Sequence, residues 1–166
     1  MAMFPDDIQL AAEAVVQAAI KAGVMIATAE SCTGGLVSGA LTAVAGSSAV
    51  LDRGFVTYSN EAKAELLGVS EGLLTQFGAV SAPVAQAMTL GAIDRSRASA
   101  AVSITGIAGP GGGSVQKPVG LVHFAAIGPE GDVVHIERRF GEIGREAVRL
   151  ESVRVALALL LDAVTA

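Results

Sequence analysis

Two short apolar segments, residues 24–29 and 98–104, constrain the fold of this chain more than any other feature. Each has the length of a strand, and segments with the apolar spacing of helices lie between them. Strands that are apolar on both sides and alternate with helices belong to parallel sheets covered on both faces. We therefore predict an α/β domain with three layers, α/β/α.

Capping and turn residues divide the rest of the chain into further elements. A first helix should follow Pro5, with Asp6 or Asp7 as its N-cap and Gly23 at its end. We expect later helices over 34–44, over 61–67 with Asn60 as N-cap, over 71–77, from Ser81 to about Arg97, and from about 142 to 164. A strand should include 55–58, and 120–127 and 133–140 should form a hairpin. The hairpin makes the predicted sheet mixed, though mostly parallel. No repeat or linker interrupts it, so residues 1–166 are predicted to be one domain.

Composition excludes several classes of protein. Apolar residues make up 52% of the chain and charged residues 16%, which is too apolar for a disordered chain. The net charge is −5 without any basic run, so we expect neither nucleic acid nor a membrane as partner. The uncharged segment 31–51 is too rich in Gly, Ser and Thr to span a membrane. One cysteine, Cys32, and a start without signal-peptide features favour the cytoplasm.

A glycine turn follows the first apolar strand. The sequence of residues 28–35 is TAESCTGG, which places Thr33, Gly34 and Gly35 between a strand and a helix. Ligands gather at the carboxyl ends of strands in such sheets, and the N–H groups of a glycine turn suit an anion. Glu30 would be a helix cap or an orienting carboxylate. An ordinary polar turn remains the alternative, and Cys32 is better explained as a packing residue than as a nucleophile.

Lys63 occupies an unusual position, the first turn of the helix predicted over 61–67. The positive end of the helix dipole disfavours a cation there. A lysine whose charged form is destabilised can act as a general base, although a solvated surface lysine is the simpler interpretation.

Two further motifs suit a phosphate or a ribose. Residues 105–114, TGIAGPGGGS, form a glycine-rich loop after the second apolar strand, with neither the ending of a P-loop nor the context of a dinucleotide fingerprint. Arg145 and Arg149 share one face at the start of the last helix, where arginine can grip an anion with two hydrogen bonds. A mobile surface loop and two exposed cations are the alternatives.

Taken together, these motifs resemble the CinA C-terminal domain family, the nicotinamide-nucleotide amidohydrolases (PncC), over nearly the whole chain. The segments that carry the resemblance are AESCTGG (29–35), GFVTYSNEAK (54–63), LGV (67–69), GAVS (78–81), TGIAGPGG (105–112), KPVG (117–120) and GREAVR (144–149). The chain is similar to the stand-alone form, because it has no room for the N-terminal molybdopterin-binding-like domain that some members carry.

The resemblance implies hydrolysis of nicotinamide mononucleotide to nicotinate mononucleotide and ammonia, a step of NAD salvage, by a serine–lysine mechanism without metal or cofactor. It assigns Ser48 as nucleophile and Lys63 as base, with Ser31 and Tyr58 beside them; which of Ser31 and Ser48 attacks stays open. The nucleotide would be bound by nine residues: Thr33, Gly34, Gly35, Asn60, Thr105, Gly106, Gly109, Gly111 and Arg145.

Three alternatives to this function remain at the level of the sequence. They are a nucleotide-sensing domain without catalysis, an amidase that uses Cys32, and a structural interaction domain. The two histidines, His123 and His135, lie in separate strand-like segments and give little support to a zinc site. We expect a homo-oligomer, although the Ala- and Leu-rich last helix is better explained as part of the internal core.

Overall fold

The computed structural model describes all 166 residues. Its helices are α1 (Asp6–Ala22), α2 (Leu36–Thr42), α3 (Asn60–Leu67), α4 (Glu71–Phe77), α5 (Ala82–Asp94) and α6 (Arg145–Thr165). Its strands are β1 (Ile26–Glu30), β2 (Leu51–Val56), β3 (Ala100–Gly106), β4 (Leu121–Ile127) and β5 (Val133–Arg139), and a 3₁₀ turn, η1 (Ser47–Ala49), precedes β2.

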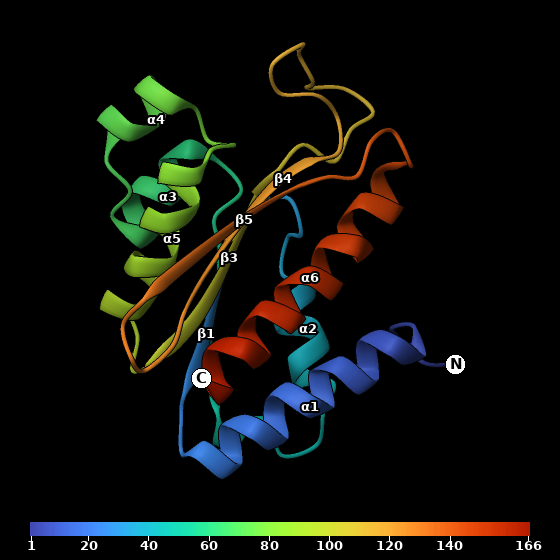
Figure 1. Cartoon of the computed structure of the whole chain (residues 1–166), viewed down its shortest axis with the longest axis vertical. Helices are drawn as coiled ribbons and strands as arrows, with labels where there is room; N and C mark the ends of the chain where they lie inside the picture. Colours follow the sequence, from blue (N-terminus) through green and yellow to red (C-terminus); the bar gives the residue numbers. More distant parts are fainter.

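The five strands form one mixed sheet in the order β2-β1-β3-β4-β5. Strand β1 pairs in parallel with β2 and β3, whereas β4 pairs antiparallel with β3 and β5. Helices α3, α4 and α5 lie on one face, and α1, α2 and α6 lie on the other (Figure 1). The predicted three-layer α/β/α architecture is therefore confirmed. The sheet is mixed as predicted, but it is half rather than mostly parallel, because β4 pairs antiparallel with both β3 and β5.

The core consists of two apolar clusters, one on each face of the sheet. The larger is built around Phe124, Leu157 and Leu160 beneath α1 and α6, and the smaller around Val84 and Met88 beneath α5. All five residues of β1 and all seven of β4 are buried, as expected for strands covered on both faces. The central strands are thereby held rigidly, and their ends can position functional side chains.

Local signals predicted helix ends better than helix starts. Gly23 and Gly68 end α1 and α3 in the left-handed conformation, and the Ser81 side chain caps α5, as predicted. The predictions for Asn60 and for Asp6 or Asp7 were wrong. Ser59 caps α3 by accepting from the Ala62 N–H, and the N-cap of α1 is Pro5, without a side-chain bond. The strand expected at 55–58 lies at 51–56, which leaves Thr57 and Tyr58 beyond its end.

No helix of the structure is both long enough and apolar enough to cross a membrane.

Candidate active site

The carboxyl ends of β1, β2 and β3 meet at one edge of the sheet. There a pocket of about 280 Å³ is lined by most of the predicted site residues: Ser31, Tyr58, Asn60, Lys63, Thr105, Gly106, Gly109, Gly111 and Arg145. Cys32, Ala79, Val80, Ile107, Ala108 and Gly112 complete its wall. Residues that are more than 100 positions apart thus converge where the parallel strands end, as expected for an open α/β sheet.

Lys63 is the most unusual side chain of this pocket, because it is only 1% exposed. Its Nζ donates to Ser31 Oγ at 3.0 Å, to the Thr57 carbonyl at 2.9 Å and to the Tyr58 carbonyl at 3.3 Å. These three acceptors match the three N–H groups of an ammonium ion. A neutral amine has two N–H groups, enough for the carbonyls, and its lone pair could then accept a hydrogen bond from Ser31 Oγ.

The position of Lys63 follows from the packing of α3. A Cβ at Gly91 of α5 would lie 2.0 Å from the Leu67 carbonyl oxygen of α3, so only glycine lets the two helices approach this closely. Helix α3 thereby lies against the sheet, and the Lys63 side chain extends past the N-terminus of α3 to the carbonyls of Thr57 and Tyr58. Burial lowers the pKa of Lys63 from its ordinary 10.5, because the charged form loses its hydration.

Glu30 fixes the turn that carries Ser31. Its carboxylate, 0% exposed, accepts from Thr33 Oγ1 at 2.7 Å and from the N–H groups of Val37 and Ser38 at 2.9 and 3.0 Å. A buried carboxylate is stable at this position because the N-terminus of α2 supplies both N–H donors and a favourable dipole. Glu30 therefore serves both as a cap and as the orienting carboxylate that the sequence suggested.

Arg145 and Tyr58 close the outer rim of the pocket. Arg145 donates through Nη1 to the Gly109 carbonyl at 2.7 Å and through Nη2 to Tyr58 Oη at 3.0 Å. Thr105 Oγ1 donates to the Ala79 carbonyl at 2.9 Å, which joins the end of β3 to the segment before α5. The rim thus joins the starts of α6 and α5 to the glycine-rich loop. Lys63 and Arg145 are the only basic side chains that line the pocket.

Ser48 lies elsewhere, which corrects the predicted pairing of Ser48 with Lys63. Ser48 is exposed in η1 and lines a separate hollow along β2, together with Ser38, Thr42 and Ser47. It precedes β2 whereas Lys63 follows it, so the six residues of the strand, about 20 Å in extended form, separate the two ends. The hydroxyl that contacts Lys63 is that of Ser31.

Thr33, Gly34 and Gly35 do not line the pocket. The Thr33 hydroxyl is bound to Glu30, Gly34 lies against Arg149, and Gly35 borders the hollow along β2. Cys32 lines the pocket but is buried, and burial raises the pKa of its thiol to about 12. The thiol therefore stays protonated at neutral pH, which disfavours Cys32 as a nucleophile.

Some residues of the site gave no clear signal in the sequence. Ala79 and Val80 form part of the wall, yet apolar residues between two helices suggest only packing. Thr57 supplies a carbonyl to Lys63, and its Oγ1 is the one buried side-chain oxygen without a hydrogen-bond partner. Unpaired buried polar atoms are uncommon in folded proteins, and one beside Lys63 fits a functional site.

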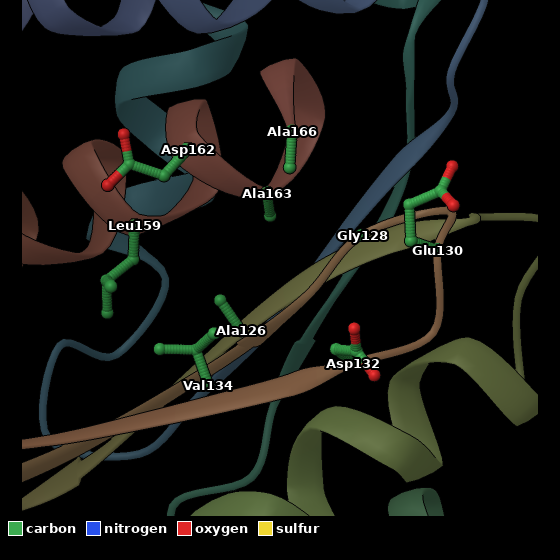
Figure 2. A pocket seen from close by; sticks show the side chains of 9 residues that line it. All are labelled: Ala126, Gly128, Glu130, Asp132, Val134, Leu159, Asp162, Ala163 and Ala166. Atoms are coloured by element: carbon green, nitrogen blue, oxygen red, sulfur yellow. The ribbon is translucent and has the colours of Figure 1, made fainter.

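The structure contains another hollow at the opposite end of the sheet. It has a volume of about 380 Å³ and lies between the end of α6 and the β4–β5 turn (Figure 2). Three carboxylates line it, those of Glu130, Asp132 and Asp162, together with apolar residues such as Leu159. None of the predicted site residues contributes to it. His, Cys, Asp and Glu side chains do not form any group of three that could hold a metal ion.

Comparisons with known proteins place the chain in a family. Residues 8–164 match the model of the CinA C-terminal domain, and the chain belongs to that family. It is 54% identical to a protein of Enterobacter agglomerans named nicotinamide-nucleotide amidohydrolase PncC, over 87% of this chain and 88% of that protein. A protein of the same name from Escherichia coli K12 is 49% identical over 95% of each chain.

A solved structure has the same fold. The crystal structure of a competence/damage inducible protein from Agrobacterium tumefaciens superposes with a TM-score of 0.96 at 56% identity, covering 98% of this chain and 99% of the other. The resemblance noted from the sequence motifs is thus confirmed at the level of the family.

Proposed function

We propose that this protein hydrolyses the carboxamide of nicotinamide mononucleotide to nicotinate mononucleotide and ammonia. The observation that carries the proposal is the contact of the buried Lys63 amine with the Ser31 hydroxyl, 3.0 Å apart in the wall of the pocket of about 280 Å³. A serine beside a lysine of lowered pKa is an activated nucleophile of the kind that amide hydrolysis requires. The names of the relatives support the same substrate.

In the proposed mechanism Ser31 is the nucleophile. Neutral Lys63 takes the proton of Ser31 Oγ while the oxygen attacks the carboxamide carbon, and the π electrons of the C=O bond move to its oxygen. When the tetrahedral intermediate collapses, the C–N bond breaks and protonated Lys63 gives its proton to the departing ammonia. Water then attacks the acyl–Ser31 ester while Lys63, neutral again, takes a proton from the water. The bond between the acyl carbon and Ser31 Oγ breaks, Lys63 returns its proton to Oγ, and nicotinate mononucleotide leaves.

The other pocket residues would bind the nucleotide. Arg145 is the only cation at the rim, and guanidinium binds phosphate through paired hydrogen bonds. The glycine-rich loop, with Thr105, Gly106, Gly109 and Gly111, would lie against ribose and phosphate, and Asn60 would contact the carboxamide. Tyr58, bound to Arg145, would orient that arginine or relay a proton.

The proposal extends to the compartment and the partners of the protein. The reaction would take place in the cytoplasm, because the only cysteine is a buried free thiol, which suits a reducing compartment. Its product, nicotinate mononucleotide, would enter NAD salvage. The protein would be a homo-oligomer that binds neither nucleic acid nor membranes. None of the proposed steps needs a metal, so turnover should survive exhaustive chelation with EDTA.

The direct test is to incubate the purified protein with nicotinamide mononucleotide and to measure ammonia and nicotinate mononucleotide. Equimolar formation of both supports the proposal. The absence of ammonia, with the nucleotide bound and unchanged, would favour the nucleotide-sensing alternative on the same fold.

A further inference from the structure

We propose that the positive charge of the substrate's pyridinium ring displaces the proton from Lys63 when the nucleotide binds, so that the catalytic base forms only in the complex. This inference rests on the proposed function and deepens it. It makes Lys63 the residue that distinguishes oxidised pyridine nucleotides, whose ring is a cation, from reduced ones, whose ring is neutral. The substrate would thereby activate the serine that attacks it.

The contact between Ser31 and Lys63 determines where the ring must lie. Ser31 Oγ is 3.0 Å from Lys63 Nζ, and the carboxamide carbon has to come within reach of Oγ before a bond can form. In nicotinamide mononucleotide the carboxamide is attached directly to the pyridine ring, whose nitrogen is positively charged because it is bonded to the ribose. Any reactive complex therefore brings the ring charge close to Nζ, wherever the ribose and the phosphate lie.

The pocket offers no anionic side chain to these two positive charges. Its lining contains two basic residues, Lys63 and Arg145, and otherwise hydroxyl, amide, thiol and apolar groups, without any Asp or Glu. The phosphate of the nucleotide is the anion of the complex, and Arg145 would pair with it. Because charges in a partly buried site are poorly screened, an ammonium ion at Lys63 and a pyridinium ring would repel each other.

Lys63 can give up its proton without leaving an unpaired group. Its three acceptors are a hydroxyl and two carbonyls, so no carboxylate holds the ammonium form in place. Burial already lowers the pKa of Lys63, and a second positive charge nearby lowers that pKa further. The ammonium loses one proton to the solvent. The two remaining N–H groups bind the carbonyls of Thr57 and Tyr58, and the lone pair accepts from Ser31 Oγ.

The groups around the pocket end of Lys63 do not offset this repulsion. Burial raises the pKa of the Cys32 thiol to about 12, so the thiol is uncharged at neutral pH. The carboxylate of Glu30 is bound by a hydroxyl and by the N–H groups of α2, and it does not line the pocket. Arg149 of α6 donates to the carbonyls of the turn after Ser31, and the Tyr58 hydroxyl accepts from Arg145.

The remaining charges of the elements packed around α3 point elsewhere. Glu61 and Glu65 of α3 itself are exposed to solvent. Arg95, at the end of α5, donates to the carbonyls of Glu65 and Leu66 near the C-terminus of α3. Asp52 lies at the other end of β2, where it pairs with arginines. None of these groups contacts Nζ, so the ring of the substrate would be the main new charge that Lys63 meets.

The test measures the protons released when the oxidised and the reduced mononucleotide bind to Ser31→Ala, a variant that cannot form the acyl intermediate. Calorimetry in buffers of different ionisation enthalpy, from about pH 6 to pH 10, gives this number. Both ligands carry the same ribose and phosphate, so their difference isolates the ring charge. The oxidised nucleotide should release about half a proton more at the pH where the difference is largest, as for a tenfold shift of the Lys63 proton equilibrium.

Two further variants in the same background show whether Lys63 is the source. Lys63→Met removes the titrating amine and keeps a long side chain, so the difference between the two nucleotides should vanish. Lys21→Met is the matched control, because Lys21 is exposed in the last turn of α1 and does not line the pocket. This control should keep the full difference.

Wild-type kinetics carry the test if Lys63→Met does not fold, judged by circular dichroism. The pH profile of kcat reports the complex, and that of kcat/KM reports the free enzyme. For nicotinamide mononucleotide the rising limb of kcat should therefore lie at lower pH than that of kcat/KM.

Equal proton release by the two nucleotides would overturn the inference, and so would a difference that persists in Lys63→Met or limbs that coincide. A wild-type protein that releases no ammonia, although its variants show the proton difference, would refute the proposed function alone. Binding of neither nucleotide would overturn both.

Discussion

The proposed chemistry depends on Lys63, whose amine is buried. An ammonium ion in this position loses its hydration, and its three hydrogen bonds replace only part of it. Burial lowers the pKa of Lys63 below 10.5, so the neutral form becomes accessible at lower pH than in water. A lysine that stayed protonated could not accept the proton of Ser31.

The sign of the pH dependence follows. Because the neutral amine is the active form, kcat/KM should rise with pH through a limb whose apparent pKa lies below 10.5. Lys63→Arg should lack that limb and lose turnover by more than about 10³-fold, since arginine keeps its proton up to a pH of about 12. A profile that is flat or falls with rising pH would contradict a neutral Lys63.

Arg145 is expected to recognise the phosphate. Two of its five N–H groups bind Gly109 and Tyr58, and the others are available to a ligand at the rim. Arg145→Ala should weaken the binding of nicotinamide mononucleotide by about ten- to a hundredfold, which is the effect of losing one charge-assisted hydrogen bond. It should affect the phosphate-free riboside far less. Equal losses of affinity for both compounds, measured by calorimetry, would exclude phosphate recognition by Arg145.

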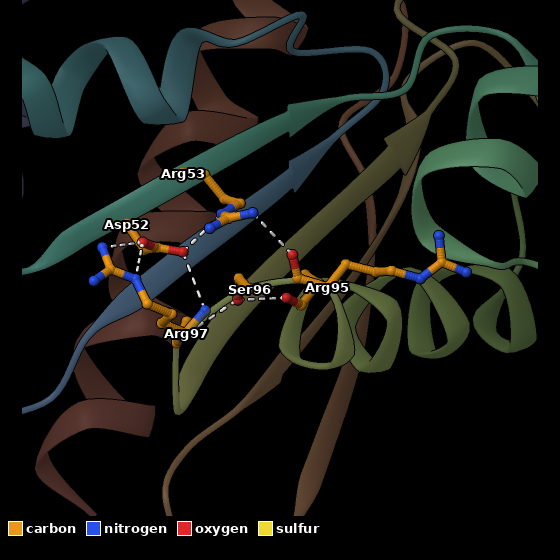
Figure 3. A network of polar contacts seen from close by, with 7 residues as sticks. Asp52, Arg53, Arg95, Ser96 and Arg97 are labelled. Atoms are coloured by element: carbon orange, nitrogen blue, oxygen red, sulfur yellow. Dashed lines mark hydrogen bonds and ion pairs between the residues drawn. The ribbon is translucent and has the colours of Figure 1, made fainter.

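At the scale of elements, strand β2 has the pocket at one end and a network of ion pairs at the other. Its carboxyl end leads to Thr57, Tyr58 and Lys63, whereas its first residues belong to an ionic network far from the pocket. There Asp52 accepts from Arg53 Nε and from the backbone and guanidinium of Arg97 (Figure 3). The side chain of Asp52 is 2% exposed, and the network joins β2 to the turn between α5 and β3.

This network predicts a pH-dependent contribution to stability. Hydrogen bonds from Arg97 and Arg53 lower the pKa of Asp52 from 3.8 to about 2. The stabilisation is complete above pH 3.8 and is lost as the pH falls through about 2. Asp52→Asn should therefore lower the urea midpoint at neutral pH, and its difference from wild type should shrink below pH 3.8 and vanish near pH 2.

The control is Glu13→Gln, which removes an exposed carboxylate of α1 that has no ion pair. It should leave the midpoint unchanged across the same range. A deficit of Asp52→Asn that persists undiminished at pH 2 would show that the charge of Asp52 is not its source.

The sequence was informative about elements because their signals are local. Apolar runs identified β1 and β3. Gly68 marked the end of α3, and Ser81 marked the start of α5. Neighbouring polar residues were ambiguous, since Ser59 and Asn60 are equally good caps and only the backbone shows that Ser59 has the extended conformation. The path of β2 was also hidden, because Asp52 and Arg53 at its start look like loop residues.

Most residues of the site could be predicted from the sequence, but the serine that contacts Lys63 could not. Lys63 could be singled out because a lysine in a first helical turn is unusual, and Arg145 and the glycine loop because they suit phosphate. Which serine contacts Lys63 depends on the end of the sheet at which each serine lies. Ser31 follows β1 and lies at the same end as Lys63, whereas Ser48 precedes β2. The distance between residues along the chain does not show this. The grip of Arg149 on Cys32 and Thr33 was hidden for the same reason, since it joins residues more than 100 positions apart.

At the scale of the molecule, the fold brings five segments distant in sequence to one edge of the sheet. Two apolar clusters on opposite faces hold that sheet, and the site lies where its parallel strands end. We propose that this convergence makes Ser31 and Lys63 one catalytic unit. The organisation of residues 1–166 as one domain and the homo-oligomer remain predictions.

This pairing can be tested by comparing ammonia release by Ser31→Ala, Ser48→Ala, Lys63→Ala and the double variant Ser31→Ala/Lys63→Ala. Ser31→Ala and Lys63→Ala should each lose nearly all turnover while still folding and binding the nucleotide. The double variant should be little worse than either, because residues that act as a unit are not additive. Ser48→Ala should keep turnover close to wild type. Wild-type turnover by Ser31→Ala together with its loss in Ser48→Ala would refute Ser31 as the nucleophile.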